Sequence, residues 1–207
     1  MPLFELKIPD NNLENNLEGK SAAKLVAYEN LQTSKIKIIQ ENIPVPPKPG
    51  EVIFCYTTNQ FNTMAFIVWI IRTIGKIRSL TITTYSIGAT SINTTYSIGA
   101  TSINTIMKWY DAGHIEEIYF YIASYTKRIS PKNIDLLTSQ ASARDRVTVS
   151  FGFNHSKILL AETDHGHFVI TGSGNFSENA YNEQYTICND ERIYKFYYDC
   201  IREDSPE

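Results

Sequence analysis

The chain has 207 residues, 43% of them hydrophobic and 20% charged, as in ordinary globular proteins and unlike disordered or fibrous ones. A formal net charge of -3 provides no overall positive field for nucleic acid or acidic lipid, and three scattered cysteines are too few for a disulfide framework or a tetrahedral zinc site. The sequence shows no signal peptide and no apolar run of membrane-spanning length. We therefore expect a soluble, cytoplasmic protein that does not engage a membrane.

The first 50 residues are predicted to form an N-terminal arm. A polar start precedes one plausible helix over about residues 17–34, and residues 41–50 then contain four prolines. Prolines at this density favour an extended linker. We therefore expect an arm and Pro-rich linker over residues 1–50 and one folded domain over residues 51–207.

From residue 51 onward, predicted strands alternate with predicted helices. This alternation predicts an α/β fold, a mixed, largely parallel sheet flanked by helices on both faces. A turn signal, Thr-Asp-His-Gly, predicts that two of the later strands form a hairpin. The expected strands are 51–57, 79–87, 115–123, 146–153, 156–162, 167–171 and 184–188, and the expected helices are 59–76, one through 106–110 to Gly113, 131–139 and 191–202.

An 11-residue segment, 83–93, is repeated without change at 94–104. An odd shift within a strand would turn every side chain to the opposite face, whereas 11 residues make about three helical turns and preserve the face of a helix. We therefore expect the extra copy to lengthen the start of the following helix or to form a bulged surface loop. A sequencing artefact is the alternative. In the helical case one stripe would hold Ile92, Tyr96, Gly99, Ile103, Met107 and Tyr110.

Candidate catalytic residues gather in the second half of the domain. His155 and Lys157 are two residues apart, as are Ser173 and Asn175, so on strands each pair would point to one face of the sheet. A hairpin turn at 164–166 would bring the two pairs onto neighbouring strands. An imidazole, an ammonium, a hydroxyl and an amide would then surround one pocket that suits a tetrahedral anion.

This pattern resembles the signature of the phospholipase D superfamily, which is His-x-Lys, a gap of four residues to Asp, and then Gly-Ser-x-Asn. The resemblance covers His155–Tyr185 best, and the order of strands and helices is compatible with the α/β fold of that family. Glu162 occupies the Asp position, with Asp164 two residues later as another candidate, and the spacing to the Gly-Ser segment is slightly longer than usual. In the family this Asp mostly supports the structure rather than attacking the substrate.

The resemblance implies a two-step reaction through a covalent phosphohistidine. His155 would attack phosphorus, and Lys157 and Asn175 would hold the nonbridging oxygens, with Ser173 hydrogen-bonding nearby. Glu183 would accept from the other ring nitrogen of the histidine and fix its tautomer. The scheme needs no metal and no other cofactor.

The mechanism calls for two histidines, one as nucleophile and one as general acid. The chain has four histidines, but only His155 lies in a His-x-Lys motif. His165 and His167 flank a turn glycine without a cluster of acids or cysteines, so we interpret them as turn residues and predict no metal site. Single-motif members resemble half of a two-motif molecule and pair about a two-fold axis. The resemblance therefore implies a C2 homodimer with one composite site.

Charge is distributed unevenly along the chain. Residues 124–157 hold six Lys and Arg against two Asp, whereas residues 158–207 hold three against ten acidic residues. A solvated face beside an acidic tail is one interpretation. The other is a path for a phosphate backbone that includes Lys127 and Arg128. We therefore predict a phosphodiesterase, an endonuclease of DNA or RNA. The alternatives are a phospholipid or small-molecule phosphodiesterase and a weakly active nucleic-acid-binding module with the same fold.

Overall fold

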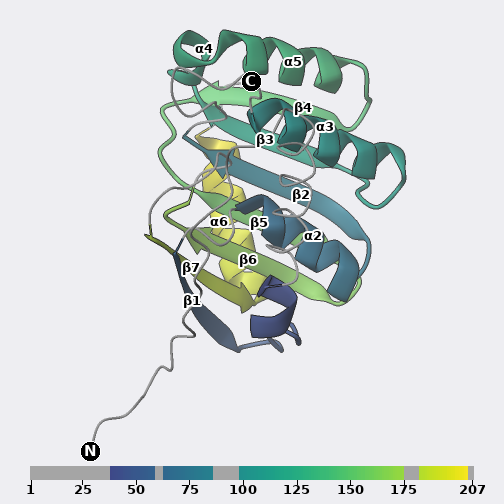
Figure 1. Cartoon of the computed structure of the whole chain (residues 1–207), viewed down its shortest axis with the longest axis vertical. Helices are drawn as coiled ribbons and strands as arrows, with labels where there is room; N and C mark the ends of the chain where they lie inside the picture. The colour runs from purple at the N-terminus through teal and green to yellow at the C-terminus, as the bar shows by residue number, and fades with distance from the viewer. Residues whose placement is uncertain (1–37, 59–62, 86–97, 175–181, 205–207) are drawn as a thin grey trace, which may run out of the picture. The chain divides into compact units, whose positions relative to one another are not determined.

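Seven strands form one mixed sheet in the part of the chain that the computed structural model describes, which is residues 38–58, 63–85, 98–174 and 182–204 (Figure 1). The chain divides into two units, residues 1–34 and 35–207, and the described residues all lie in the second. The sheet order is β1-β7-β6-β5-β2-β3-β4. The strands are β1 (Val52–Thr58), β2 (Ile77–Thr84), β3 (Ile118–Ala123), β4 (Val147–Gly152), β5 (Ile158–Thr163), β6 (Gly166–Gly172) and β7 (Asn182–Asn189).

The sheet confirms the predicted mixed α/β class but corrects the balance of strand directions. Only the β2–β3 and β3–β4 pairings are parallel among the described strands, whereas the other four pairings are antiparallel. The physical reason is clearest at β5 and β6. A two-residue turn joins them, and so short a connection can join only antiparallel neighbours. The expectation of a largely parallel sheet was therefore wrong.

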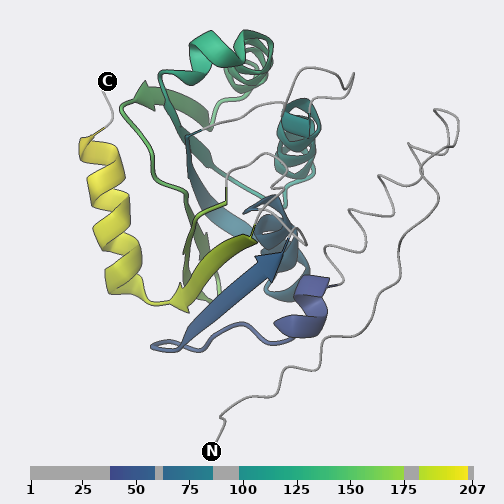
Figure 2. The ribbon, with the colours of Figure 1, turned by 60° about the vertical axis from the view of Figure 1, so that its left-hand side comes forward.

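Helices cover both faces of the sheet, as predicted (Figure 2). Residues of α2, α3 and α5 pack against one face of the sheet and form the larger hydrophobic core with it. On the other face, Tyr194 and Ile201 of α6 pack on residues such as Leu160 and Val169. Successive side chains of β5 point to opposite faces of the sheet, which explains this division. Leu159 and Ala161 face the first core, and Leu160 faces the second. The helices are α2 (Thr63–Thr73), α3 (Ile98–Asp111), α4 (Thr126–Ile129), α5 (Pro131–Ser142) and α6 (Glu191–Glu203).

Residues 38–50, which belong to the predicted N-terminal arm and Pro-rich linker, pack against the strands and helices that follow them. Ile39 is fully buried, and the indole Nε1 of Trp69 donates to the carbonyl of Ile43 at 2.8 Å. The side-chain amide of Asn189 donates to the carbonyl of Pro47 at 3.3 Å. Apolar contacts and satisfied polar groups thus hold this Pro-rich segment in place. The helix expected over 17–34 lies outside the described residues.

The two copies of the 11-residue repeat belong to different elements where they are described. The first copy supplies Thr83 and Thr84 at the end of β2, and the last seven residues of the second copy open α3. Ile103 and Met107 of the predicted stripe are buried in the core. Residues 86–97, which include Ile92 and Tyr96 of that stripe, lie outside the described residues, so the choice between a longer helix and a loop stays a prediction.

No helix in the described part of the chain has the length and apolar character needed to cross a membrane.

Candidate active site

His155 lies in the connection between β4 and β5 and not on a strand, which corrects the expected position. The preceding residue, Asn154, is buried, and its Oδ1 accepts from the backbone N–H of Ser156 at 2.9 Å and from its hydroxyl at 2.6 Å. A side-chain turn of this kind replaces strand pairing. The Nδ2 of Asn154 donates to the carbonyls of Thr84 and Tyr121, at 3.2 and 3.1 Å. The loop that carries His155 is therefore fixed to the ends of β2 and β3.

Lys157 folds back on His155 in the same loop. Its Nζ donates to the backbone carbonyl of His155 at 2.9 Å and lies 3.4 Å from the imidazole Nδ1. Partial burial lowers the pKa of the Lys157 ammonium, and the Glu183 carboxylate of β7 acts in the opposite direction and raises it. Lys157 thus contacts His155 and also interacts electrostatically with an acid from a distant strand.

The predicted hairpin brings Ser173 to this loop. The hairpin itself is confirmed, since Ile158 of β5 pairs with Thr171 of β6 and the N–H of Gly172 donates to the carbonyl of Lys157 at 3.2 Å. Ser173 follows directly and is exposed at the surface. Asn175, the other member of the predicted pair, lies outside the described residues.

Ser173 is held by the neighbouring strand β7. Its hydroxyl donates to the carboxylate of Glu183 and accepts from the backbone N–H of Gln184 at 3.1 Å. Its own N–H donates to the carbonyl of Gln184 at 3.1 Å. The Glu183 carboxylate thus accepts a hydrogen bond from Ser173, and the orientation of His155 by Glu183 stays a prediction.

Close packing requires the glycine that precedes Ser173. A Cβ at Gly172 would overlap the ring of Tyr185 and the carbonyl of Gln184 on β7. Gly174 is buried, and its carbonyl accepts from the Thr63 hydroxyl, at the start of α2, at 2.9 Å. The Gly-Ser-Gly segment therefore contacts β7 on one side and is hydrogen-bonded to the start of α2.

Tyr85, which sequence reasoning missed, lies beside the candidate nucleophile. Its ring centroid is 4.6 Å from that of the His155 imidazole, and its backbone carbonyl accepts from the Thr126 hydroxyl at 2.8 Å. A signal was present in the sequence. Tyr85 directly follows a buried β-branched run, and ligands of open α/β sheets bind beyond the carboxyl ends of such strands.

Lys127 and Arg128, the predicted substrate-binding residues, lie on α4, which begins at Thr126 beside Tyr85. Both side chains are exposed. The Nζ of Lys127 is 4.0 Å from the centroid of the Phe151 ring, and the guanidinium carbon of Arg128 is 4.6 Å from that of Tyr125. The structure therefore places these two cations at the same end of the sheet as His155.

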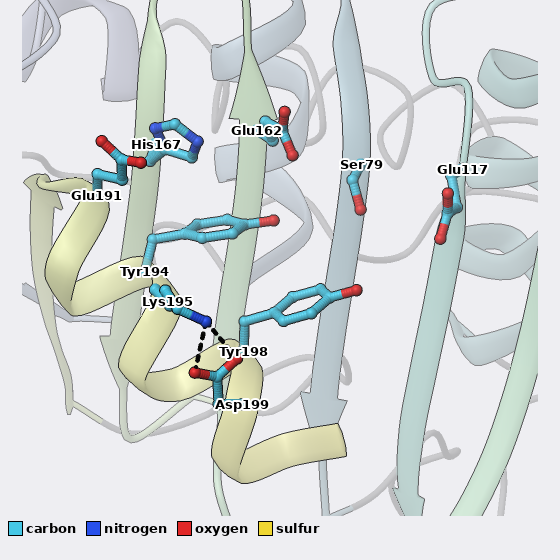
Figure 3. Close-up of a pocket in the computed structure, with 9 residues that line it drawn as sticks. All are labelled: Ser79, Glu117, Glu162, His167, Glu191, Tyr194, Lys195, Tyr198 and Asp199. Carbon is cyan, nitrogen blue, oxygen red and sulfur yellow. Dashed lines mark hydrogen bonds and ion pairs between the residues drawn. The ribbon is translucent and has the colours of Figure 1, made fainter. Parts of the chain in front are cut away.

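Glu162, at the expected Asp position, lies at the opposite end of β5, where it pairs with Ser79 and His167. Figure 3 shows it in a groove between the sheet and α6, where Tyr194 and Tyr198 reach over the strands. Asp164, the second candidate, forms an ion pair with Arg78 at that same end. Neither acid contributes to the site around His155.

The remaining three histidines also lie at that far end. His165 is in the turn between β5 and β6, and His167 is the second residue of β6. The carbonyl of His114 accepts from the N–H of Ile77, whose strand partner is Thr163. Among the described residues, no three His, Cys, Asp or Glu side chains are placed to hold one metal ion.

No protein-family model and no curated protein match the sequence. The structure is similar to a phospholipase D family member, Nuc from Salmonella typhimurium, with a TM-score of 0.51 and 14% identity, over 75% of this chain and 96% of Nuc. The chain has a phospholipase D-like fold. A polyphosphate kinase from Porphyromonas gingivalis is similar at a TM-score of 0.52 and 12% identity, over 76% of this chain but 26% of the kinase. The phospholipase D resemblance inferred from the motif is thus confirmed at the level of the fold.

Proposed function

We propose that this chain is a metal-independent phosphodiesterase that cleaves DNA or RNA internally through a phosphohistidine at His155. The observation that supports the proposal is that Lys157 contacts His155 within one loop and interacts with Glu183 of a separate strand, which in turn accepts from Ser173 at the end of the hairpin. The phospholipase D-like fold supports the same reaction class, since the two similar structures are named as a phospholipase D family member and a polyphosphate kinase.

In the proposed first step, a ring nitrogen of His155 forms a bond to phosphorus while the bond from phosphorus to the leaving oxygen breaks. A general acid gives that oxygen a proton. Lys157, the Ser173 hydroxyl and Asn175 stabilise the negative charge on the nonbridging oxygens in this scheme. In the second step, water attacks phosphorus, the phosphorus–nitrogen bond breaks, and the proton of the water returns to the group that acted as the acid.

The proposed general acid is His155 of a second copy of the chain. The other three histidines of the same chain lie beyond the six-residue strand β5, which separates them from His155 by roughly 20 Å. A histidine in that position cannot reach the leaving oxygen. A two-fold homodimer that brings the two His155 side chains together would complete the site.

The test is cleavage of plasmid DNA and of RNA in EDTA by the wild type, by His155→Ala and by the control His165→Ala, which changes an exposed turn histidine. We expect EDTA-resistant cleavage that His155→Ala abolishes and His165→Ala retains. Loss of cleavage in EDTA, or equal activity of the His155 variant, would contradict the mechanism. Turnover of phospholipid alone would favour a lipid phosphodiesterase, and binding without cleavage would favour a nucleic-acid-binding module.

A further inference from the structure

A row of aromatic rings leads away from the candidate nucleophile across the surface. The Tyr85 ring beside His155 stacks in turn on the Tyr125 ring, with centroids 6.2 Å apart and an interplanar angle of 15°. Tyr125 belongs to the connection between β3 and α4, and 44% of its surface is exposed. Tyr85 is thus held against the protein, while part of the Tyr125 side chain is exposed to solvent.

A second exposed ring lies immediately before the nucleophile in sequence. Phe153 is fully exposed, although the next residue, Asn154, is buried. Both the Nδ2 and the Oδ1 of the Asn154 side chain form hydrogen bonds. The anchored Asn154 fixes the backbone from which Phe153 projects. A phenylalanine in that position contributes nothing to either hydrophobic core. Its exposed ring is available to a ligand that approaches His155.

Cations accompany these rings. Arg128 lies over the Tyr125 ring at 4.6 Å, Lys127 lies over Phe151 at 4.0 Å, and the Nζ of Lys157 is 5.8 Å from the centroid of Tyr85. Alternation of exposed aromatic rings with Lys and Arg is how proteins bind single-stranded nucleic acid, because the rings stack on bases and the cations follow the phosphates. In a duplex the faces of the bases are already covered by neighbouring base pairs.

We propose that Tyr125 and Phe153 form a base-stacking surface, so that the substrate of the site is single-stranded nucleic acid. This inference rests on the proposed phosphodiesterase function and names its substrate class. The bases adjacent to the scissile phosphate stack on the two exposed rings, and Lys127 and Arg128 contact the neighbouring phosphates. Unstacked bases are required for this arrangement, so a regular duplex uses only the cations.

Binding is measured on the His155→Ala protein, so that turnover does not consume the probe. The probe is a labelled 12-mer, single-stranded or annealed to its complement, and the readout is fluorescence anisotropy. We expect the single strand to bind more tightly, and Tyr125→Ala or Phe153→Ala to weaken its binding by roughly 5- to 100-fold, the loss expected for one stacked base. Tyr125→Phe retains the ring and should retain binding. The control Phe196→Ala removes a ring that is 60% exposed on α6 and should change nothing.

Equal affinity for the single strand and the duplex, or an equal loss in Phe196→Ala, would overturn the inference. So would a change of oligomeric mass in Phe153→Ala by light scattering, because the ring would then belong to a contact between copies. Hydrolysis of bis(p-nitrophenyl) phosphate by the wild type separates the two proposals. Its absence together with selective single-strand binding would contradict the proposed phosphodiesterase and leave the stacking surface in place.

Discussion

The ring of Tyr85 lies against the imidazole of His155, with centroids 4.6 Å apart and the planes tilted by 54°. The Thr126 hydroxyl holds the backbone of Tyr85, so this ring is a fixed support for the proposed nucleophile. Tyr85→Ala should lower kcat by roughly 10- to 100-fold with a smaller change in KM, because a misplaced imidazole loses its alignment with phosphorus. Tyr85→Phe keeps the ring and should restore most of the rate. Steady-state kinetics of both variants test this, and a low rate in Tyr85→Phe would show that the hydroxyl, not the ring, matters.

A composite site makes a specific prediction for mixed subunits. When wild type and His155→Ala are unfolded together in equal amounts and refolded, only dimers with two intact histidines should be active. At equal total protein, one quarter of the dimers then hold two wild-type chains. Activity per total protein should therefore be about a quarter of that of the wild type alone, and not half. Mixing with His165→Ala provides the control for refolding losses. Half activity at equal mixing would show that each chain works with its own histidine.

Asn154 joins the loop that carries His155 to two strands and should matter for stability as well as activity. Asn154→Ala removes the Nδ2 donor to the carbonyls of Thr84 and Tyr121, and should lower the free energy of unfolding by about 1–3 kcal/mol. Ser156→Ala removes one hydroxyl and should cost less. Urea unfolding measures both. An unfolding free energy of Asn154→Ala equal to that of the wild type would contradict the anchoring role.

Gly172 should tolerate no side chain, because its neighbours on β7 occupy the space. Gly172→Ala would force β6 away from Tyr185 and displace Ser173, so the expected loss is about 1–3 kcal/mol in stability together with lower activity. Ser139→Ala, on the exposed side of α5, is a matched control and should be neutral. Thermal melting and the cleavage assay provide the two measurements. A Gly172→Ala protein with unchanged melting would mean that the strands separate freely at this point.

The α6 N-terminus should respond to acid. Asp190 caps the helix by accepting from the N–H groups of Arg192 and Ile193, and its hydrogen bond with the Arg192 side chain is the main cause that lowers its pKa to about 2. A carboxylate with a depressed pKa stabilises the fold above its ordinary pKa near 3.9, and this contribution is lost as the pH falls through about 2. Asp190→Asn keeps an acceptor but does not titrate.

The Tm of the wild type should therefore fall more between pH 5 and pH 2 than that of Asp190→Asn. Asp199→Asn, which breaks an exposed ion pair with Lys195, serves as the comparison and should behave like the wild type. Parallel acid profiles of the wild type and Asp190→Asn would argue against this cap.

Local patterns in the sequence were sufficient for most elements and for the hairpin that carries Ser173, because period-2 alternation and turn residues act over short distances. They did not reveal that His155 lies in a loop, since that depends on Asn154 reaching strands some 30 and 70 residues earlier in the chain. The balance of strand directions, too, depends on which strands become neighbours. The partnership of Glu183 with Ser173 likewise arises from pairing between β6 and β7.

The 11-residue repeat straddles the junction between β2 and α3, and this position has a consequence for how the fold tolerates it. Removing residues 83–93 or residues 94–104 yields one and the same sequence, in which a single Thr-Thr-Tyr would still end the strand and a single Ile-Gly-Ala-Thr-Ser-Ile-Asn would still begin the helix. The duplication therefore changed neither the residues that close β2 nor those that open α3. With one copy or two, the residue that follows the end of β2 is a tyrosine, so the support for His155 keeps its chemical identity.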